Sequence, residues 1–117
     1  MAISIPIFTS QLEKSREATD AANLRAAYAE VMAAALTQDT DTASGVTITK
    51  DTTDTTKIVS ITKFVERKQA QKDWQNTSID DIGGVGTDSI GVTCTKKGWT
   101  VTWTATTNAV TFPESDS

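Results

Sequence analysis

The chain has 117 residues, the length of one domain with a single modest core, and its 38% hydrophobic and 22% charged residues are typical of a folded domain with a polar surface. A net charge of −4 repels nucleic-acid phosphates and anionic lipid head groups, so no nucleic-acid partner is expected. The sequence has no histidine, the commonest acid–base residue and metal ligand, and its single cysteine, Cys94, excludes an internal disulfide. Composition therefore argues against an enzyme.

A long helix is predicted over residues 3–37. From Ser10 to Leu36 the chain has no Gly or Pro and is dominated by strong helix formers. A first stripe of small and apolar side chains recurs at steps of three and four along the whole helix: Phe8, Leu12, Ser15, Thr19, Ala22, Ala26, Ala29, Ala33 and Leu36. A second stripe is confined to the C-terminal half and consists of Leu24, Tyr28, Val31 and Ala35.

The two stripes allow two interpretations. The bulky second stripe suits packing on a sheet, whereas the small side chains of the first stripe let another backbone approach closely. Alternatively, both stripes belong to one wide core face, and periodicity alone does not choose between these interpretations.

Residues 38–44 are expected to form a loop, and residues 45–112 an antiparallel meander of about four to five strands. The mixture of Thr, Val and Ile in this part is typical of strands. A strand over 45–50 and a second strand from Lys57 are predicted to form a hairpin through the polar turn "DTTDTT".

The remainder of the sheet is predicted in chain order. We expect "ERKQAQKDWQ" (66–75) to continue as an edge strand rather than to form a short helix, and 76–89 to be a glycine-containing loop. Strands that begin at Ile90, Gly98 and Ala109 would complete the meander, followed by a frayed polar tail over 113–117.

Alternation within "GWTVTWTA" places Trp99, Val101, Trp103 and Ala105 on one face of a strand and threonines on the other. We expect the tryptophan face to pack on the helix. The predicted helix–sheet core therefore consists of Leu24, Tyr28, Val31, Trp99, Val101 and Trp103. Trp74 is expected to cap this core from beside the glycine-containing loop.

No motif points to catalysis, a cofactor or a metal. The stretch "GGVGTDS" lacks the glycine spacing of nucleotide-binding loops, and "DTDTASG" lacks the bidentate Glu that ends a calcium loop. Asp80 and Asp81 are consecutive, so on an extended segment their carboxylates point in opposite directions. Cys94 is expected to be a small buried hydrophobe. We therefore predict no catalytic residue, no cofactor and no metal ligand.

The stretch "ISIPIFTSQLEKSREATDAANLRAAYAEVMAAAL" (3–36) closely resembles the helix of type IV pilins, in particular those of Gram-positive, Clostridia-like bacteria. "VERKQAQKDWQ" and "GWTVTW…AVTF" agree more loosely with the sheets of such pilins. The resemblance implies a single type IV pilin-like α+β domain over 1–117, with one long helix on an antiparallel sheet. It also implies a structural subunit of an extracellular, cell-surface pilus, whose partners are other pilin subunits and the pilus assembly machinery.

In such pilins an apolar half-helix precedes the part that this sequence matches. The resemblance thus implies a precursor anchored in the cytoplasmic membrane only through that half-helix, with Met1 as a start codon supplied for a shortened chain. It assigns Ile5, Pro6, Ile7, Phe8, Leu12, Ala22 and Ala26 to filament assembly. Pro6 would kink a helix that continued through it, but it is tolerated in a first turn. The lone cysteine departs from the C-terminal disulfide of many pilins.

Two alternatives stay open. The chain could be a pseudopilin of a type II secretion or competence system, because both classes pack the helix in the same way. It could also be an adhesive binding module at a pilus tip, with Trp74 and "IDDIGGVG" (79–86) as the ligand surface.

Overall fold

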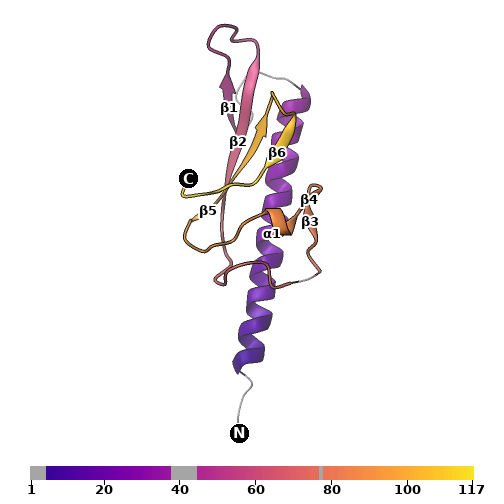
Figure 1. Cartoon of the computed structure of the whole chain (residues 1–117), viewed down its shortest axis with the longest axis vertical. Helices are drawn as coiled ribbons and strands as arrows, with labels where there is room; N and C mark the ends of the chain where they lie inside the picture. Colours follow the sequence, from indigo (N-terminus) through magenta and orange to yellow (C-terminus); the bar gives the residue numbers. More distant parts are fainter. Residues whose placement is uncertain (1–4, 38–44, 77) are drawn as a thin grey trace.

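In the computed structural model of the chain, the described residues are 5–37, 45–76 and 78–117, and for residues 5–10 the backbone alone is described. One long helix packs along one side of an antiparallel sheet (Figure 1). The predicted α+β fold is thereby confirmed. The molecule is elongated, with a longest extent of 68 Å, because the helix runs on past the sheet at its N-terminal end (Figure 1).

The helix, α1, spans Ile5–Thr37. Its 33 residues correspond to a length of about 50 Å. Pro6 lies in the first turn, where its missing N–H leaves no helical hydrogen bond unmade. The remainder of the helix lacks Gly and Pro, so nothing in its sequence interrupts it.

The main sheet has five antiparallel strands in the order β1-β2-β5-β6, with β7 also paired to β5. Its strands are β1 (Thr47–Lys50), β2 (Ile58–Glu66), β5 (Gly98–Thr104), β6 (Ala109–Thr111) and β7 (Glu114–Ser115). A separate hairpin is formed by β3 (Asp81–Ile82) and β4 (Val85–Gly86), and a 3-10 turn, η1, follows at Thr87–Ser89. The strand number agrees with the prediction of about four to five strands.

Two predicted strands are wrong. β2 ends at Glu66, and residues 67–76 form a loop instead of an edge strand. Residues 90–97 likewise contain no strand, because the carbonyl groups of Ile90 and Gly91 accept hydrogen bonds from the indole N–H groups of Trp74 and Trp99. Cys94 adds a left-handed turn to this segment, with φ of 60°.

Two smaller corrections concern the loop and the tail. The glycine-containing stretch 76–89 holds the β3–β4 hairpin and η1 rather than a plain loop. The tail 113–117 is tied to the sheet, because β7 pairs with the start of β5. The loop predicted over 38–44 lies outside the described residues.

The core lies between α1 and the inner face of the sheet. Leu24 and Val31 of the helix are fully buried, as are Trp99 and Val101 of β5, and Trp103 is 5% exposed. Tyr28 is half-buried and its ring stacks on Phe112, with ring centroids 6.5 Å apart. Ala105 follows the end of β5 and is exposed, so the inward face of that strand ends at Trp103.

Candidate assembly surface

The first stripe of α1 lies on the exposed side of the helix. Leu12 is 51% exposed and Leu36 is 79% exposed. The positions between them are exposed as well: Ser15, Thr19, Ala22, Ala26, Ala29 and Ala33. None of these side chains is charged. Ile5, Pro6, Ile7 and Phe8 belong to the helix, but their side chains lie outside the described part of the structure.

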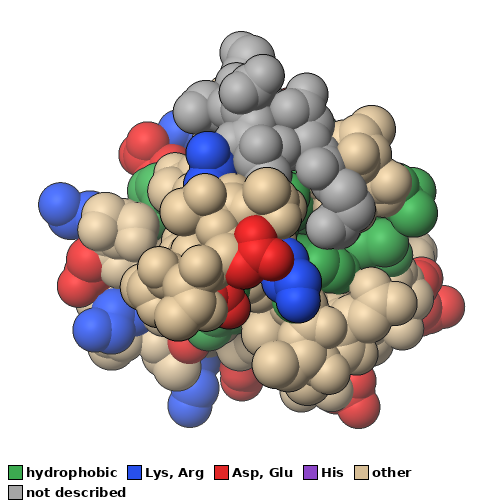
Figure 2. Space-filling model, turned by 90° about the horizontal axis from the view of Figure 1, so that it is seen from above, with side chains coloured by type: hydrophobic (Ala, Val, Ile, Leu, Met, Phe, Trp, Pro, Cys, Tyr) green, Lys and Arg blue, Asp and Glu red, His purple; other side chains and the backbone are tan. Residues whose placement is uncertain are grey.

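Seen from above, charged side chains of both signs are spread over this end of the molecule, and hydrophobic side chains are visible mainly at its right-hand flank (Figure 2). A helix that faces only water usually has charged residues on its outer side. The exposed, uncharged side of α1 is therefore the candidate functional surface.

The opposite side of α1 has an unexpected composition in its N-terminal half. Glu13, Glu17 and Asp20 lie on the line that continues through Leu24, and their exposed fractions are only 2%, 0% and 0%. A pattern of apolar positions alone does not identify this row, because all three side chains are acidic. The spacing of these carboxylates would have indicated it: they continue, toward the N-terminus, the steps of three and four residues by which the sheet-facing side chains recur.

Each of the three carboxylates accepts backbone hydrogen bonds from the 67–76 loop. Asp20 binds the N–H groups of Lys68 at 2.8 Å and Gln69 at 2.9 Å. Glu13 binds those of Ala70 at 2.9 Å and Gln71 at 2.8 Å. Glu17 binds those of Gln75 and Asn76, the latter at 3.0 Å. These side chains supply the acceptors that a neighbouring strand would otherwise supply, which explains why this segment is not a strand.

Burial decides the electrostatics of this row. Desolvation raises the pKa of Asp20 above its ordinary value, and the N–H groups of Gln69 and Lys68 oppose the rise. The Gln69 side-chain amide approaches the same carboxylate without reaching hydrogen-bond geometry. Glu17 Oε2 is buried and has no hydrogen-bond partner among the described residues.

The row does not form a metal site. Glu13 and Asp20 are seven residues apart, about 10 Å along the helix, so their carboxylates do not converge. Among the residues that the structure describes, no group of three or more His, Cys, Asp or Glu side chains could hold a metal ion. The nearest basic partner of Glu13 is Arg16, at 3.9 Å. The chemistry of the row is attachment of the loop to the helix.

The C-terminal half of α1 is attached to its neighbours differently. The ammonium group of Lys63 in β2 forms a 2.5 Å ion pair with Glu30, and Arg25 donates to the backbone carbonyl of Asp81 at 3.2 Å. Gly83 has φ of 60°, and a Cβ at this position would lie 2.6 Å from the ring of Tyr28. A glycine therefore lets the β3–β4 hairpin sit directly on Tyr28.

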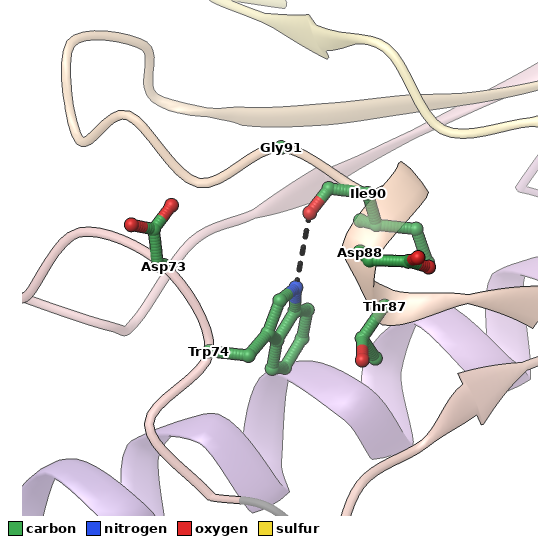
Figure 3. Close-up of a pocket in the computed structure, with 6 residues that line it drawn as sticks. All are labelled: Asp73, Trp74, Thr87, Asp88, Ile90 and Gly91. Atoms are coloured by element: carbon green, nitrogen blue, oxygen red, sulfur yellow. Dashed lines mark hydrogen bonds between the residues drawn. The ribbon is translucent and has the colours of Figure 1, made fainter.

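Trp74 lines an open pocket of about 300 Å³ together with Asp73, Thr87, Asp88, Ile90 and Gly91 (Figure 3). Its indole N–H donates to the Ile90 carbonyl at 3.1 Å, and its ring stacks on Trp99 with centroids 6.2 Å apart. The carboxylates of Asp73 and Asp88 point away from each other (Figure 3). Trp74 thus contributes to packing against the core, and the two carboxylates of the pocket do not converge on a common point.

Cys94 is half-buried against the core rather than on a strand. Desolvation raises the pKa of its thiol, which favours the protonated, unreactive form.

No protein-family model, no curated protein and no solved structure matches the chain. Within the described residues, no helix combines the length and the apolar character that a membrane crossing requires. Assignment of a function therefore depends on the fold and on the exposed side of α1.

Proposed function

We propose that this chain is a type IV pilin, a structural subunit of an extracellular, cell-surface pilus that assembles with copies of itself through the exposed side of α1. One observation carries the proposal. The side of α1 that faces the sheet is buried, whereas its opposite side presents an uncharged stripe that is exposed from Leu12 to Leu36. The resemblance of residues 3–36 to pilin helices agrees with this division.

The side chains of the stripe suit helix–helix packing. Ala22 and Ala26 are four residues apart, as are Ala29 and Ala33, so small side chains recur on the same side of the helix. Small side chains let a second backbone approach closely and gain dispersion energy over a long contact. The absence of charge means that packing does not desolvate an unpaired ion.

The carboxylate row complements this use of the helix. Glu13, Glu17 and Asp20 attach the 67–76 loop to the inner side of α1, in the half of the helix where the apolar core ends. Among the described residues the domain is thus held along α1 chiefly through its inner side, and of the outer stripe Ala26 borders the groove between α1 and β2. In the proposed pilus that outer side packs against neighbouring subunits and the sheet faces outward.

Substitution of Ala26 by Arg tests the proposal. Ala26 is exposed, so a long charged side chain should leave the domain folded while it blocks close helix packing. We expect surface filaments to disappear in the organism that encodes the chain, as measured by electron microscopy and by immunoblotting of sheared filaments.

Ala105→Arg is the matched control, because Ala105 is also exposed but follows β5, outside α1. This variant should assemble normally. Normal filaments from Ala26→Arg, or no filaments containing the unmodified chain, would contradict the proposal.

A further inference from the structure

We infer that neighbouring copies of this chain also contact each other head to tail, with an aspartate-bearing hairpin of one copy docked at a basic hollow of the next. The inference rests on the proposed function and adds a second contact to it. The occupant of the hollow is a second copy, since the same chain has both complementary surfaces.

The basic hollow has a volume of about 490 Å³ and is lined by Phe64, Glu66, Arg67 and Lys97. Phe64 is 36% exposed, so an apolar ring is available at this surface. The Arg67 guanidinium donates to the backbone carbonyls of Lys96 and Gln69, not to a carboxylate.

The charges at the hollow are incompletely balanced. Lys97 forms no ion pair within the described part of the chain, whereas Glu66 pairs with Lys68 at 3.7 Å. Asp116 also lies beside the hollow: it accepts a hydrogen bond from the backbone N–H of Lys97 at 3.2 Å, and its carboxylate pairs with Lys96 at 3.6 Å. Among the described residues at the hollow, the side-chain charges of Arg67 and Lys97 are therefore the ones left without an ion-pair partner.

The aspartate knob consists of Asp80, Asp81 and Asp88, on and beside the β3–β4 hairpin and η1. All three are exposed, and none forms an ion pair within residues 45–76 or 78–117 or with the described side chains of α1. Asp81 Oδ2 accepts a hydrogen bond from the N–H of Gly84 at 3.0 Å. Gly84 at the tip has no atom within 4 Å of its Cβ position, so the tip is narrow and open.

The two surfaces lie on opposite sides of the molecule. In Figure 1, β3 and β4 lie to the right of α1, whereas the start of β5 and the end of β2 lie to the left. Two copies therefore cannot satisfy both surfaces by a two-fold symmetric contact. A head-to-tail contact repeats from copy to copy, and it builds an open filament when the rotation does not close a ring. Opposite charges across this contact favour correct orientation during encounter.

Charge reversal tests the inference in filaments assembled by the full chain. Lys97→Glu and Asp88→Lys should each lower the yield of sheared filaments about fivefold, because each places like charges across the contact. The double variant Lys97→Glu with Asp88→Lys restores opposite charges and should recover most of the yield. Asp80→Lys repeats the test if Asp88→Lys lowers the urea midpoint of the purified domain.

Lys57→Glu is the matched control, because it changes the net charge by the same amount at the β1–β2 turn and should assemble normally. Normal yields from both Lys97→Glu and Asp88→Lys, or no recovery in the double variant, would overturn the inference. The proposed function fails separately, since it requires Ala26→Arg to abolish filaments whatever the charge variants do.

Discussion

Replacement of Asp20 by Ala is the most direct perturbation of the carboxylate row. Asp20 is fully buried and binds the backbone N–H groups of Lys68 and Gln69. The substitution removes both acceptors from the start of the 67–76 loop and leaves the bonds from Glu13 and Glu17 in place.

The expected cost follows from the burial of each donor. Gln69 is 1% exposed, so its N–H would stay buried without an acceptor, at a cost of about 1–3 kcal/mol. Lys68 is exposed, so water can replace the lost bond and the cost there is small. Removal of a carboxylate that is costly to desolvate offsets part of the loss. We expect the free energy of unfolding to fall by about 1–2 kcal/mol, an appreciable part of the stability of a small domain.

Urea denaturation, monitored through the fluorescence of the buried Trp99, measures the change in the free energy of unfolding. Amide hydrogen exchange locates it: protection should fall at Lys68 and Gln69 and persist at Gln75 and Asn76, which Glu17 holds. Thr19→Ala is the control, because Thr19 is exposed on the outer side of the same helix. A loss of less than about 0.5 kcal/mol, with unchanged protection at Gln69, would refute the structural role of the row.

Two further predictions concern the pH dependence of stability and the steric room at two glycines. Burial raises the pKa of Asp20 above its ordinary value of 3.8, so over the pH range between the two values the folded state binds a proton that the unfolded state has lost. The contribution of Asp20 to the free energy of unfolding is then greatest below pH 3.8 and falls as the pH rises through the raised pKa. In urea titrations, the difference in free energy of unfolding between the wild type and Asp20→Asn should therefore become smaller from about pH 3.5 to pH 7. A difference that grows with pH would show that the N–H hydrogen bonds outweigh desolvation. Gly98→Ala should destabilise the domain by about 3 kcal/mol or more, because its Cβ would lie 1.9 Å from the Val65 carbonyl oxygen across the β2–β5 pair. Gly84→Ala, whose Cβ would meet no atom within 4 Å but whose φ is 85°, should cost only about 1–2 kcal/mol in the same urea titrations. Equal losses from the two variants would contradict the steric argument.

The parts of the fold that were predictable are those that local pattern determines. The helix over 5–37 follows from its helix-forming composition and from the three-and-four spacing of its small and apolar side chains, both of which are local to the segment. Alternation in "GWTVTWT" places the tryptophans of β5 on the inner face, because side chains alternate along any strand. Short connections account for the neighbours β1–β2 and β5–β6, whereas β2 and β5 pair across residues 67–97, a long connection in which two strands were wrongly predicted.

The segments that were not predictable depend on distant partners. "IGVTCT" has strand propensity, but its first carbonyls bind indole groups that come from Trp74 and from Trp99. The 67–76 loop depends on carboxylates that lie 48–59 residues earlier in the chain. The local sequence of either segment does not indicate these partners. The spacing of Glu13, Glu17 and Asp20 does indicate that the three carboxylates lie on the sheet-facing side of the helix.

The carboxylate row and the 67–76 loop each remove an energetic difficulty of the other. A carboxylate buried on a helix is unstable unless several donors surround it, and a loop buried against a helix is unstable unless its N–H groups find acceptors. Six backbone donors meet three carboxylates here, so both requirements are met at one contact. Leucines at the same positions would leave the N–H groups of the loop without acceptors, and they would make the first half of α1 uncharged on both its inner and its outer sides. Such a helix could bury either side against the sheet. Because the inner side is acidic, only that side can accept the loop, and the uncharged outer side is left exposed for the partner proposed above.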